Sequence, residues 1–453
     1  MASPRLGPAT LLAYAAPGLV LALFISPFPS LVAAFFAKYT AATTGGIATV
    51  LLFTRILDGV VDPPLGYLSD RTHSRFGPRK PWIFAGLFLT MGAIWAMFMP
   101  PEGAGDGHFA LAMVLHALGL SLIDIPLKAW AGELATDYQE RARIAGYVTF
   151  AILSGGMIFM LLPEVLAALG VVEHSAFDLP MMAIMGKVAL VLAPLALLVT
   201  LVMVPQGKGA AQAATHGIAE IFNTVRHNRP FWTFMSADGL TQIGFGAFYA
   251  VFFVALDSYF GLGANVPVIL LTVTLSQLAS IPLVSMAARR FGKHRVWGVA
   301  WIAHSAVLPL ILLFGPGDTP LLPFCALSAL LAVLQTPQMM LPMAMVSDIA
   351  DFDTMRSGRN RQGSYYAFRL MCLKGMSAIG AALGFYALSV SGFDPKSSIH
   401  DATAITGMLT AMLAIPGITF LGAGLILLRF PIDARRHAII RAWIDRRQAR
   451  ALP

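Results

Sequence analysis

Hydrophobic residues run along this chain in long unbroken stretches, without the alternation of apolar and polar positions that marks strands. Apolar windows recur at residues 11–37, 82–99, 144–169, 181–204, 266–287, 296–314 and 405–428. A helix needs about 20 residues to cross the roughly 30 Å of hydrocarbon in a bilayer, so each window is long enough to span one. With the further windows that glycine, proline and charge clusters separate, we expect about twelve spans. The pattern predicts an all-α integral membrane protein.

Composition supports lipid as the main solvent of the chain. Hydrophobic residues make up 57% of it, charged residues only 12%, and the mean hydropathy is +0.73. Too little polar surface is available to cover soluble domains of this length. The two cysteines, Cys325 and Cys372, fall in apolar stretches without metal-ligand spacing, so neither a disulfide framework nor a metal site is predicted. We find no nucleophile–base pair or phosphate-binding loop, and therefore expect neither an enzyme nor a cofactor.

The net charge of +8 describes topology. Lys and Arg gather in alternate loops, whereas the loops at 100–108 and 171–178 contain neither. By the positive-inside rule the basic loops and both termini are cytoplasmic, which predicts a multi-pass protein of the plasma (inner) membrane. The first apolar run is too long for a cleaved signal peptide and is expected to be the first span. Because topology accounts for the charge, we expect membrane lipids and a small substrate as partners, and no nucleic acid.

The chain divides into two similar halves. The segment GYLSDRTHSRFGPRK after the second span has an echo in SMAARRFGKHR after the eighth, and ELATDYQERARIAGY after the fourth has one in VSDIADFDTMRSGRNRQGSYY after the tenth. Two parallel halves of six helices with a site near the mid-membrane plane are typical of the major facilitator superfamily. We therefore expect bundles at 1–204 and 230–430, a cytoplasmic interdomain loop at 205–229 and a basic cytoplasmic tail at 431–453. The tail is predicted to form an amphipathic surface helix or a solvated one.

Charged residues inside a predicted span mark the candidate site. Arg55, Asp58 and Asp62 lie three and four positions apart, so they share one face of a helix. A charge at the bilayer centre costs at least about 2.5–3.5 kcal/mol, so such residues usually line an interior cavity and serve ions, protons or substrates. The alternative is that Arg55 simply neutralises the carboxylates, but two acids for one base leave a net negative site.

Other spans carry further polar groups. Asp124 and Lys128 lie one turn apart, with Ser121 a turn before them, and an intrahelical Asp–Lys pair is the simpler explanation. In the second half, Asp238 and Lys374 are the matching intramembrane charges. Two amides add hydrogen-bonding capacity or serve only as contacts between helices: Gln242 and Gln338.

These residues together resemble the glycoside-pentoside-hexuronide:cation symporter family of the major facilitator superfamily. The similarity covers R-x-x-D-x-x-x-D-P-x-x-G-x-x-x-D-R-T-x-S-R-x-G at 55–77, D-I-P at 124–126, ELATDYQERAR, VSDIADFD and a Lys-Gly pair at 374–375. The resemblance implies that Asp58 and Asp62 bind the coupling Na⁺, Li⁺ or H⁺, with the Ser121 hydroxyl nearby. It also implies that Asp124 belongs to the sugar site and that Lys374 lies beside the cation site.

Departures from the family pattern affect both the ion and the substrate. Val61 stands where an asparagine would supply an oxygen ligand, which favours H⁺ without excluding Na⁺. Lys128 aligns with the aromatic residue that stacks on sugar, and Thr149 aligns with a sugar-binding arginine. A cation at 128 suits an anionic or amphiphilic substrate.

We therefore predict a monomeric H⁺- or Na⁺-coupled symporter for a sugar-like solute such as a glycoside or hexuronide, working by alternating access. The alternatives are a transporter of lysophospholipids or other amphiphilic anions, since relatives with the same charged span move such lipids, and a non-transporting sensor or assembly factor. Candidate substrate-binding residues are Arg55, Asp124, Lys128, Thr149, Asp238, Gln242, Gln338 and Lys374.

Loop charges form a second candidate group. Acidic helix ends that face basic loops are expected to make salt bridges that hold one state of the carrier and break in the other. The alternative is a set of solvated charges that contribute little each. Candidate gating residues are Asp70, Arg71, Arg75, Glu133, Arg141, Asp348 and Asp351.

Overall fold

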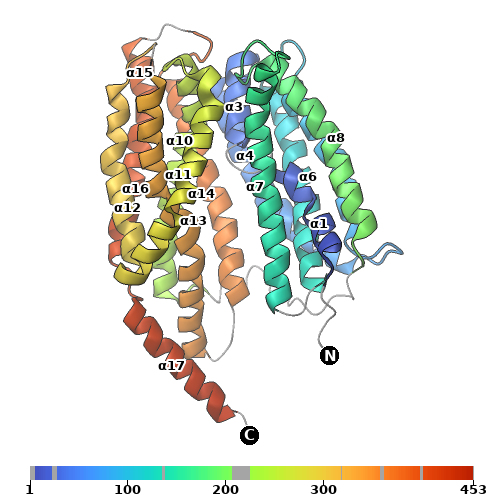
Figure 1. The fold of residues 1–453 in the computed structure, drawn as a ribbon, viewed down its shortest axis with the longest axis vertical. Coiled ribbons are helices and arrows are strands. Elements are labelled where there is room, and N and C mark those ends of the chain that lie inside the picture. Colours follow the sequence, from blue (N-terminus) through green and yellow to red (C-terminus); the bar gives the residue numbers. More distant parts are fainter. Residues whose placement is uncertain are drawn as a thin grey trace. The chain divides into compact units, whose positions relative to one another are not determined.

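The computed structural model describes residues 6–22, 28–134, 138–206, 225–317, 319–357, 362–397 and 401–451, and its regular structure there is helical throughout (Figure 1). Among these residues, eleven helices are long and apolar enough to cross a membrane. A shorter apolar helical stretch, Pro8–Leu21, precedes them. The predicted all-α membrane fold is confirmed.

The helices fall into two compact units. Unit 1 comprises Met1–Thr215, Phe252–Pro267 and Gly392–His400, and unit 2 comprises His216–Val251, Val268–Ser391 and Asp401–Pro453. Two hydrogen bonds show why short segments from late in the sequence belong to unit 1. Ser175 donates to the carbonyl of Ala264 at 2.8 Å, and Ser258 donates to the carbonyl of Pro395 at 2.7 Å.

Unit 1 contains the first eight helices. They are α1 (Pro8–Ala15), α2 (Pro17–Leu21), α3 (Phe28–Tyr39), α4 (Thr44–Arg71), α5 (Lys80–Phe98), α6 (Asp106–Leu134), α7 (Tyr138–Ala168) and α8 (Leu179–Met203). The predicted span 11–37 corresponds to α1, α2 and α3, with residues 23–27 outside the described part. The expected loop at 205–229 also lies mostly outside it.

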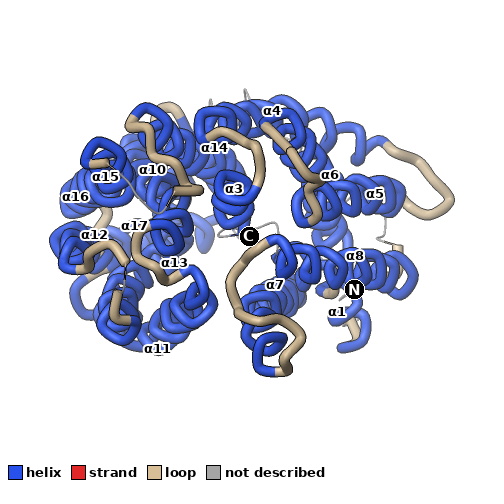
Figure 2. Tube along the Cα trace, turned by 90° about the horizontal axis from the view of Figure 1, so that it is seen from above, coloured by secondary structure: helices blue, strands red, loops and turns tan. Residues whose placement is uncertain are grey.

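Small residues let helices approach closely in unit 1. The most extensive packing is between α5 and α6, which run side by side in Figure 2. A Cβ added to Gly86 would lie 2.8 Å from Ile123, and one added to Gly119 would lie 2.9 Å from the Thr90 backbone nitrogen. Close packing of this kind holds membrane helices together, since burial of apolar groups adds little between helices in lipid.

Unit 2 contains the helices from α10 onward, except for the last residues of α10 and the first two of α11. They are α10 (Arg229–Ser258), α11 (Val266–Phe291), α12 (Lys293–Val307), α13 (Leu321–Ser357), α14 (Gln362–Val390), α15 (Ala402–Leu409), α16 (Ile415–Leu428) and α17 (Ala434–Ala451).

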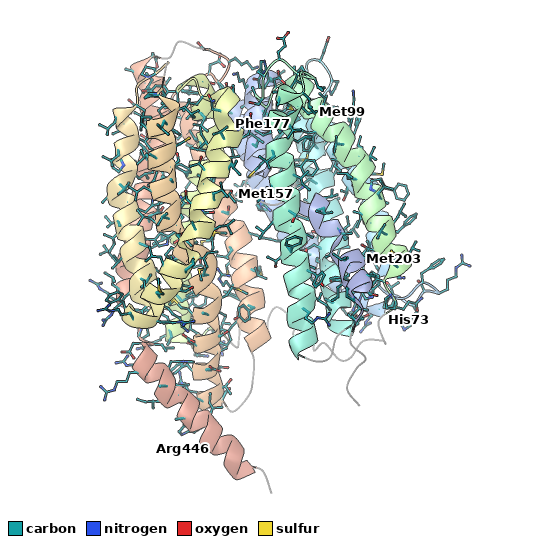
Figure 3. The ribbon with its side chains drawn as sticks, in the orientation of Figure 1. His73, Met99, Met157, Phe177, Met203 and Arg446 are labelled. Carbon is teal, nitrogen blue, oxygen red and sulfur yellow. The ribbon has the colours of Figure 1, made fainter. Side chains whose placement is uncertain are left out.

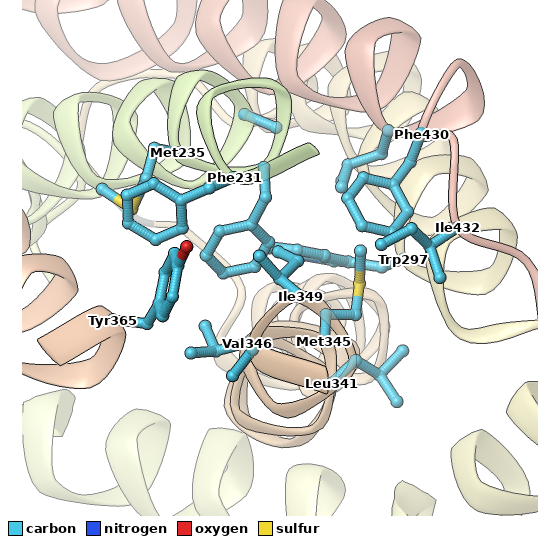
Figure 4. Close-up of a cluster of buried hydrophobic side chains, with 14 of the residues drawn as sticks. Phe231, Met235, Trp297, Leu341, Met345, Val346, Ile349, Tyr365, Phe430 and Ile432 are labelled. Carbon is cyan, nitrogen blue, oxygen red and sulfur yellow. The ribbon is translucent and has the colours of Figure 1, made fainter. Parts of the chain in front are cut away.

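A cluster of buried apolar side chains joins α10, α12, α13, α14 and α16. Phe231 of α10 lies against Tyr365 of α14 with ring centroids 5.0 Å apart, and Trp297 of α12 and Val346 of α13 belong to the same cluster (Figure 4). The cluster extends into the tail helix α17 through Ile440. The tail of unit 2 therefore packs on the bundle.

The outer surfaces of the helices are apolar. Val202 and Met203 near the end of α8 are 80% and 54% exposed, and Met203 projects outward from unit 1 in Figure 3. Exposed side chains of this kind suit contact with lipid chains. Helix α13 has 37 residues and is about 55 Å long, so part of it extends beyond the hydrocarbon.

Candidate cation and substrate site

Helix α4 carries the first ion pair of the candidate site. Its start is fixed by Thr43, whose side chain accepts a hydrogen bond from the Gly46 N–H at 2.9 Å. Arg55 Nη1 donates to Asp58 Oδ2 at 3.0 Å, and the side chains are 29% and 11% exposed. Asp62 follows Asp58 by four residues on the same helix face.

Helix α6 supplies the hydroxyl of this site. Ser121, which is 5% exposed, donates to Asp62 Oδ1 at 2.5 Å. The contact joins residues 59 positions apart in the chain. The structure therefore brings Asp62 and Ser121 together, beside the Arg55–Asp58 pair.

Helix α6 also carries an ion pair, which begins one turn after Ser121. Lys128 Nζ donates to Asp124 Oδ2 at 2.6 Å, with side chains 70% and 27% exposed. A carboxylate that is partly accessible can accept hydrogen bonds from substrate hydroxyls, and an exposed ammonium can meet an anionic group. Thr149 on α7 is also exposed.

Unit 2 holds a different cluster of polar residues. Asp238 of α10 is fully buried; its Oδ2 accepts from Arg369 Nε at 2.7 Å and its Oδ1 accepts from Gln338 Nε2 at 3.0 Å. Arg369 is a residue that sequence reasoning missed, although a charge within an apolar stretch five positions before Lys374 was a usable signal. Gln242 lies one turn after Asp238 and is half-buried.

The predicted residues are therefore divided between the units. Arg55, Asp58, Asp62, Ser121, Asp124, Lys128 and Thr149 lie in unit 1, and Asp238, Gln242, Gln338 and Lys374 lie in unit 2. Direct contacts link Arg55 to Asp58, Ser121 to Asp62, Lys128 to Asp124 and Gln338 to Asp238. Lys374 occupies an exposed position on α14.

The candidate gating residues of unit 1 have partners near by. Glu133 binds Arg79 Nη2 at 2.8 Å, both side chains being 5% exposed, and Arg79 also donates to Ser69 at 2.6 Å. Arg71 stacks on the Tyr67 ring at 4.2 Å. Arg75 stacks similarly on Phe76, and the side chains of Asp70 and Arg141 lie outside the described part.

The candidate gating residues of unit 2 bind groups within that unit. Lys293 Nζ contacts both carboxylate oxygens of Asp348 at 2.8 and 2.6 Å. His437 of the tail helix lies 3.0 Å from Asp351 Oδ2 and 3.4 Å from Asp348 Oδ1. Sequence reasoning missed His437 as a partner of these acids.

This arrangement of membrane helices with paired charges has known relatives. Residues 9–434 match the MFS/sugar transport protein family. The chain belongs to this family.

Known proteins resemble the chain over most of its length. The putative glycoside/cation symporter YagG of Escherichia coli (strain K12) is 25% identical, covering 92% of this chain and 91% of that protein. The sodium-dependent lysophosphatidylcholine symporter 1-A of Danio rerio is 22% identical over 86% of this chain and 79% of its own. The crystal structure of the nucleoside transporter NupG has the same fold, with a TM-score of 0.63, 15% identity and coverage of 94% and 100%.

These similarities identify the protein as a multi-pass membrane transporter of the sugar-symporter type, in a family of transporters, not enzymes. Within the described residues of this MFS/sugar transport protein, no group of three or more His, Cys, Asp or Glu side chains is placed to hold a metal ion.

Unit 1 contains a further ion pair that the sequence pattern did not predict. Lys38 of α3 binds Asp257, in the segment at the end of α10 that belongs to unit 1, and its ammonium lies 5.2 Å from the centroid of the Tyr39 ring. Both charged side chains are 28% exposed. Lys38 and Asp257 each lie at the end of an apolar run and are 219 positions apart in the sequence. Only their opposite charges could have suggested that they pair.

Proposed function

We propose that the protein is a cation-coupled symporter that moves a sugar-like solute by alternating access, with the coupling cation bound at Asp58 and Asp62. The observation that supports this most directly is the 2.5 Å contact between Ser121 and Asp62, next to the Arg55–Asp58 pair in unit 1. Carboxylates and a hydroxyl are thereby gathered at adjacent turns of two membrane helices, which is a costly arrangement unless it serves an ion or a proton.

The ligand set favours H⁺ as the coupling cation. Na⁺ needs several oxygen ligands, whereas H⁺ needs one carboxylate whose environment disfavours the charged form. The candidate ligands are the carboxylates of Asp58 and Asp62 and the hydroxyl of Ser121, and Val61 between the two acids offers no oxygen. Na⁺ is the alternative that the experiment below separates from H⁺.

The candidate substrate groups in unit 1 are Asp124 and Lys128. The Asp124 carboxylate accepts from Lys128 at 2.6 Å and is partly accessible, so it can bind sugar hydroxyls. The exposed Lys128 ammonium can pair with a substrate carboxylate, as in a hexuronide. The relative YagG is named a putative glycoside/cation symporter, which agrees with a substrate of this class.

A lysophospholipid is the second candidate substrate. The similarity to the lysophosphatidylcholine symporter of Danio rerio supports it, and Lys128 offers a cation for a phosphate group. The two candidate substrates differ in the contacts that they need, since a lipid also requires apolar contacts for its acyl chain.

Coupling follows if cation and substrate stabilise the same state. Each then raises the affinity for the other by the same factor. Charge supports this link, because a proton or Na⁺ at Asp58 or Asp62 on α4 offsets negative charge next to α6, the helix that carries Asp124. In this proposal the termini lie on the cytoplasmic side, as the positive-inside rule indicates for the basic loops. The loop charges contribute to gating.

The test is substrate-induced proton movement in vesicles that contain the purified protein. A panel of glycosides, hexuronides and lysophosphatidylcholine is added without Na⁺, and external pH is followed. The wild type should alkalinise the medium with its substrate, and Asp62→Asn should abolish both this signal and accumulation. Glu102→Gln, which removes an exposed carboxylate outside the spans, serves as the matched control and should behave as the wild type does.

Two results would overturn parts of the proposal. Accumulation that persists undiminished in Asp62→Asn would contradict the cation site. Uptake that requires Na⁺ and moves no protons would keep the site but contradict H⁺ as the coupling cation.

A further inference from the structure

The first turn of the tail helix α17 places a histidine against two acids of α13. His437 Nε2 lies 3.0 Å from Asp351 Oδ2 and 3.4 Å from Asp348 Oδ1, and the imidazole is 27% exposed. Histidine is the side chain that ordinarily changes charge between pH 5 and 8. Its attraction to two carboxylates is at full strength only while the ring carries its second proton.

Apolar contacts hold the same helix against unit 2. Ile440 and Ile444 are 6% and 5% exposed and belong to the cluster that contains Trp297 and Val346. They lie three and seven positions after His437, so all three share one face of α17. The opposite side bears exposed Arg446, which points away from the bundle in Figure 3. Docking of α17 therefore combines a pH-independent apolar part with an electrostatic part.

A cavity of about 410 Å³ reaches the imidazole and gives water access to it. His437 and Asp348 line it, together with Met345 and Ile432 of the apolar wall. Its remaining charged lining comes from Arg289 at the end of α11, Lys293 and His294 at the start of α12, and Asp433 just before α17. Proton exchange at His437 thus needs no rearrangement of the bundle.

The other charged groups around His437 come from α11, α12, α13 and the segment just before α17. Lys293 already binds both oxygens of Asp348. The N–H of Arg436 donates to Asp433 at 2.8 Å, and this hydrogen bond lowers the pKa of the Asp433 carboxyl, so Asp433 stays ionised at neutral pH. Arg289 is cationic throughout, and His294 is the other histidine of the cavity.

We propose that α17 is a pH-dependent clamp: it docks on the end of α13 when His437 is protonated and loosens when His437 is neutral. When α17 is docked, His437 contacts Asp348 and Asp351, and Lys293 also binds Asp348. The proposed function includes a gating role for these acids. If they gate transport, a lower pH on the side of the tail keeps them bound to His437 and slows transport. The docking itself does not depend on that function.

The test measures the distance between the tail and the bundle. Spin labels at Arg446→Cys on α17 and Arg290→Cys on α11, both exposed positions, are placed in the full-length protein with Cys325 and Cys372 replaced by Ala. Electron spin resonance distances are recorded at pH 5.5 and 8.5. The ratio of docked to undocked tail should fall by roughly two- to fivefold at the higher pH, as expected for a partly exposed ion pair.

Two variants of His437 supply the controls. His437→Lys keeps a cation at both pH values, so the tail should stay docked at both. His437→Gln is neutral at both, so it should match the wild type at pH 8.5 and show no dependence on pH. A wild-type distance that does not change with pH, or a dependence that persists in His437→Gln, would overturn the clamp; a loss of bundle folding is excluded by following thermal unfolding of each variant.

Discussion

Both units contain an aspartate–arginine pair within membrane helices, and the two pairs differ in their surroundings. In unit 1, Arg55 and Asp58 lie 3.0 Å apart with side chains 29% and 11% exposed, and Asp62 follows one turn later. In unit 2, Arg369 and Asp238 lie 2.7 Å apart with side chains 8% and 0% exposed, and Gln338 takes the second carboxylate oxygen. We call the first pair open, because it is partly exposed and lies next to a second acid. We call the second pair sealed, because it is buried and has one positive charge for one negative charge.

The same residue types serve two purposes in the two units. A sealed pair whose carboxylate oxygens are both occupied leaves no ligand for an arriving ion, so we interpret Asp238–Arg369 as a fixed link between α10 and α14. An open pair with an extra carboxylate and a hydroxyl beside it can accept a cation. We therefore interpret Asp238 and Gln338 as structural residues, and the proposed ion site stays on α4 and α6.

The largest expected effect comes from breaking the sealed pair. Asp238→Leu leaves the Arg369 guanidinium buried and uncompensated, which should cost about 3–5 kcal/mol of folding stability. Asp58→Asn, at the open pair, should cost less, because the Arg55 side chain left without its partner is 29% exposed. Unfolding in detergent, followed by circular dichroism, measures both.

A double variant separates lost charge balance from lost packing. Asp238→Leu combined with Arg369→Met removes both charges and should recover most of the stability, because no buried ion remains unpaired. Equal costs for Asp238→Leu and Asp58→Asn would remove the distinction between sealed and open pairs.

A smaller effect is expected at the hydroxyl of the open site. Ser121→Ala removes the donor to Asp62 while leaving the fold intact, and a hydrogen bond to a charged group contributes about 1.5–3 kcal/mol. If H⁺ is the coupling cation, loss of this donor destabilises the ionised Asp62, and the apparent affinity for H⁺ should rise by roughly tenfold or more. If Na⁺ is the coupling cation, loss of an oxygen ligand should lower its apparent affinity. Either change is measured as the shift in the pH or Na⁺ dependence of uptake. Ser121→Thr keeps a hydroxyl and should stay close to the wild type; an unchanged ion dependence in Ser121→Ala would place the cation elsewhere.

The sequence predicted features that lie along one helix far better than contacts between helices. Long apolar windows predicted the spans, and a spacing of three and four placed Arg55, Asp58 and Asp62 on one face, because helical periodicity alone decides both. The pair between Asp238 and Arg369 joins residues 131 positions apart, and His437 meets Asp351 across 86 positions. No periodicity relates such residues, so Arg369 and His437 were missed although both are visible in the sequence.

Partner choice was hard to foresee for the same reason. Glu133 was expected to face basic loops in a gate, and the partner that the structure gives it, Arg79, comes from the loop just before α5 and is itself buried. Asp348 likewise binds Lys293 at the start of α12. Many cations are available in the loops, and only the packing of helix ends decides which one reaches each acid.

The smallest change in stability is expected at Lys128, which makes it the sharpest probe of substrate charge. Its pair with Asp124 is 70% exposed on the lysine side, so Lys128→Ala should change stability by less than about 1 kcal/mol. Thermal-shift measurements with a glucuronide, a neutral glycoside and lysophosphatidylcholine then report binding without interference from unfolding. Lys128→Ala should weaken the shift with the anionic sugar and leave that with the neutral glycoside unchanged, while Lys128→Arg retains both. A loss restricted to lysophosphatidylcholine would favour the lipid as substrate, and equal shifts in wild type and Lys128→Ala for every compound would show that the open side of α6 does not read substrate charge.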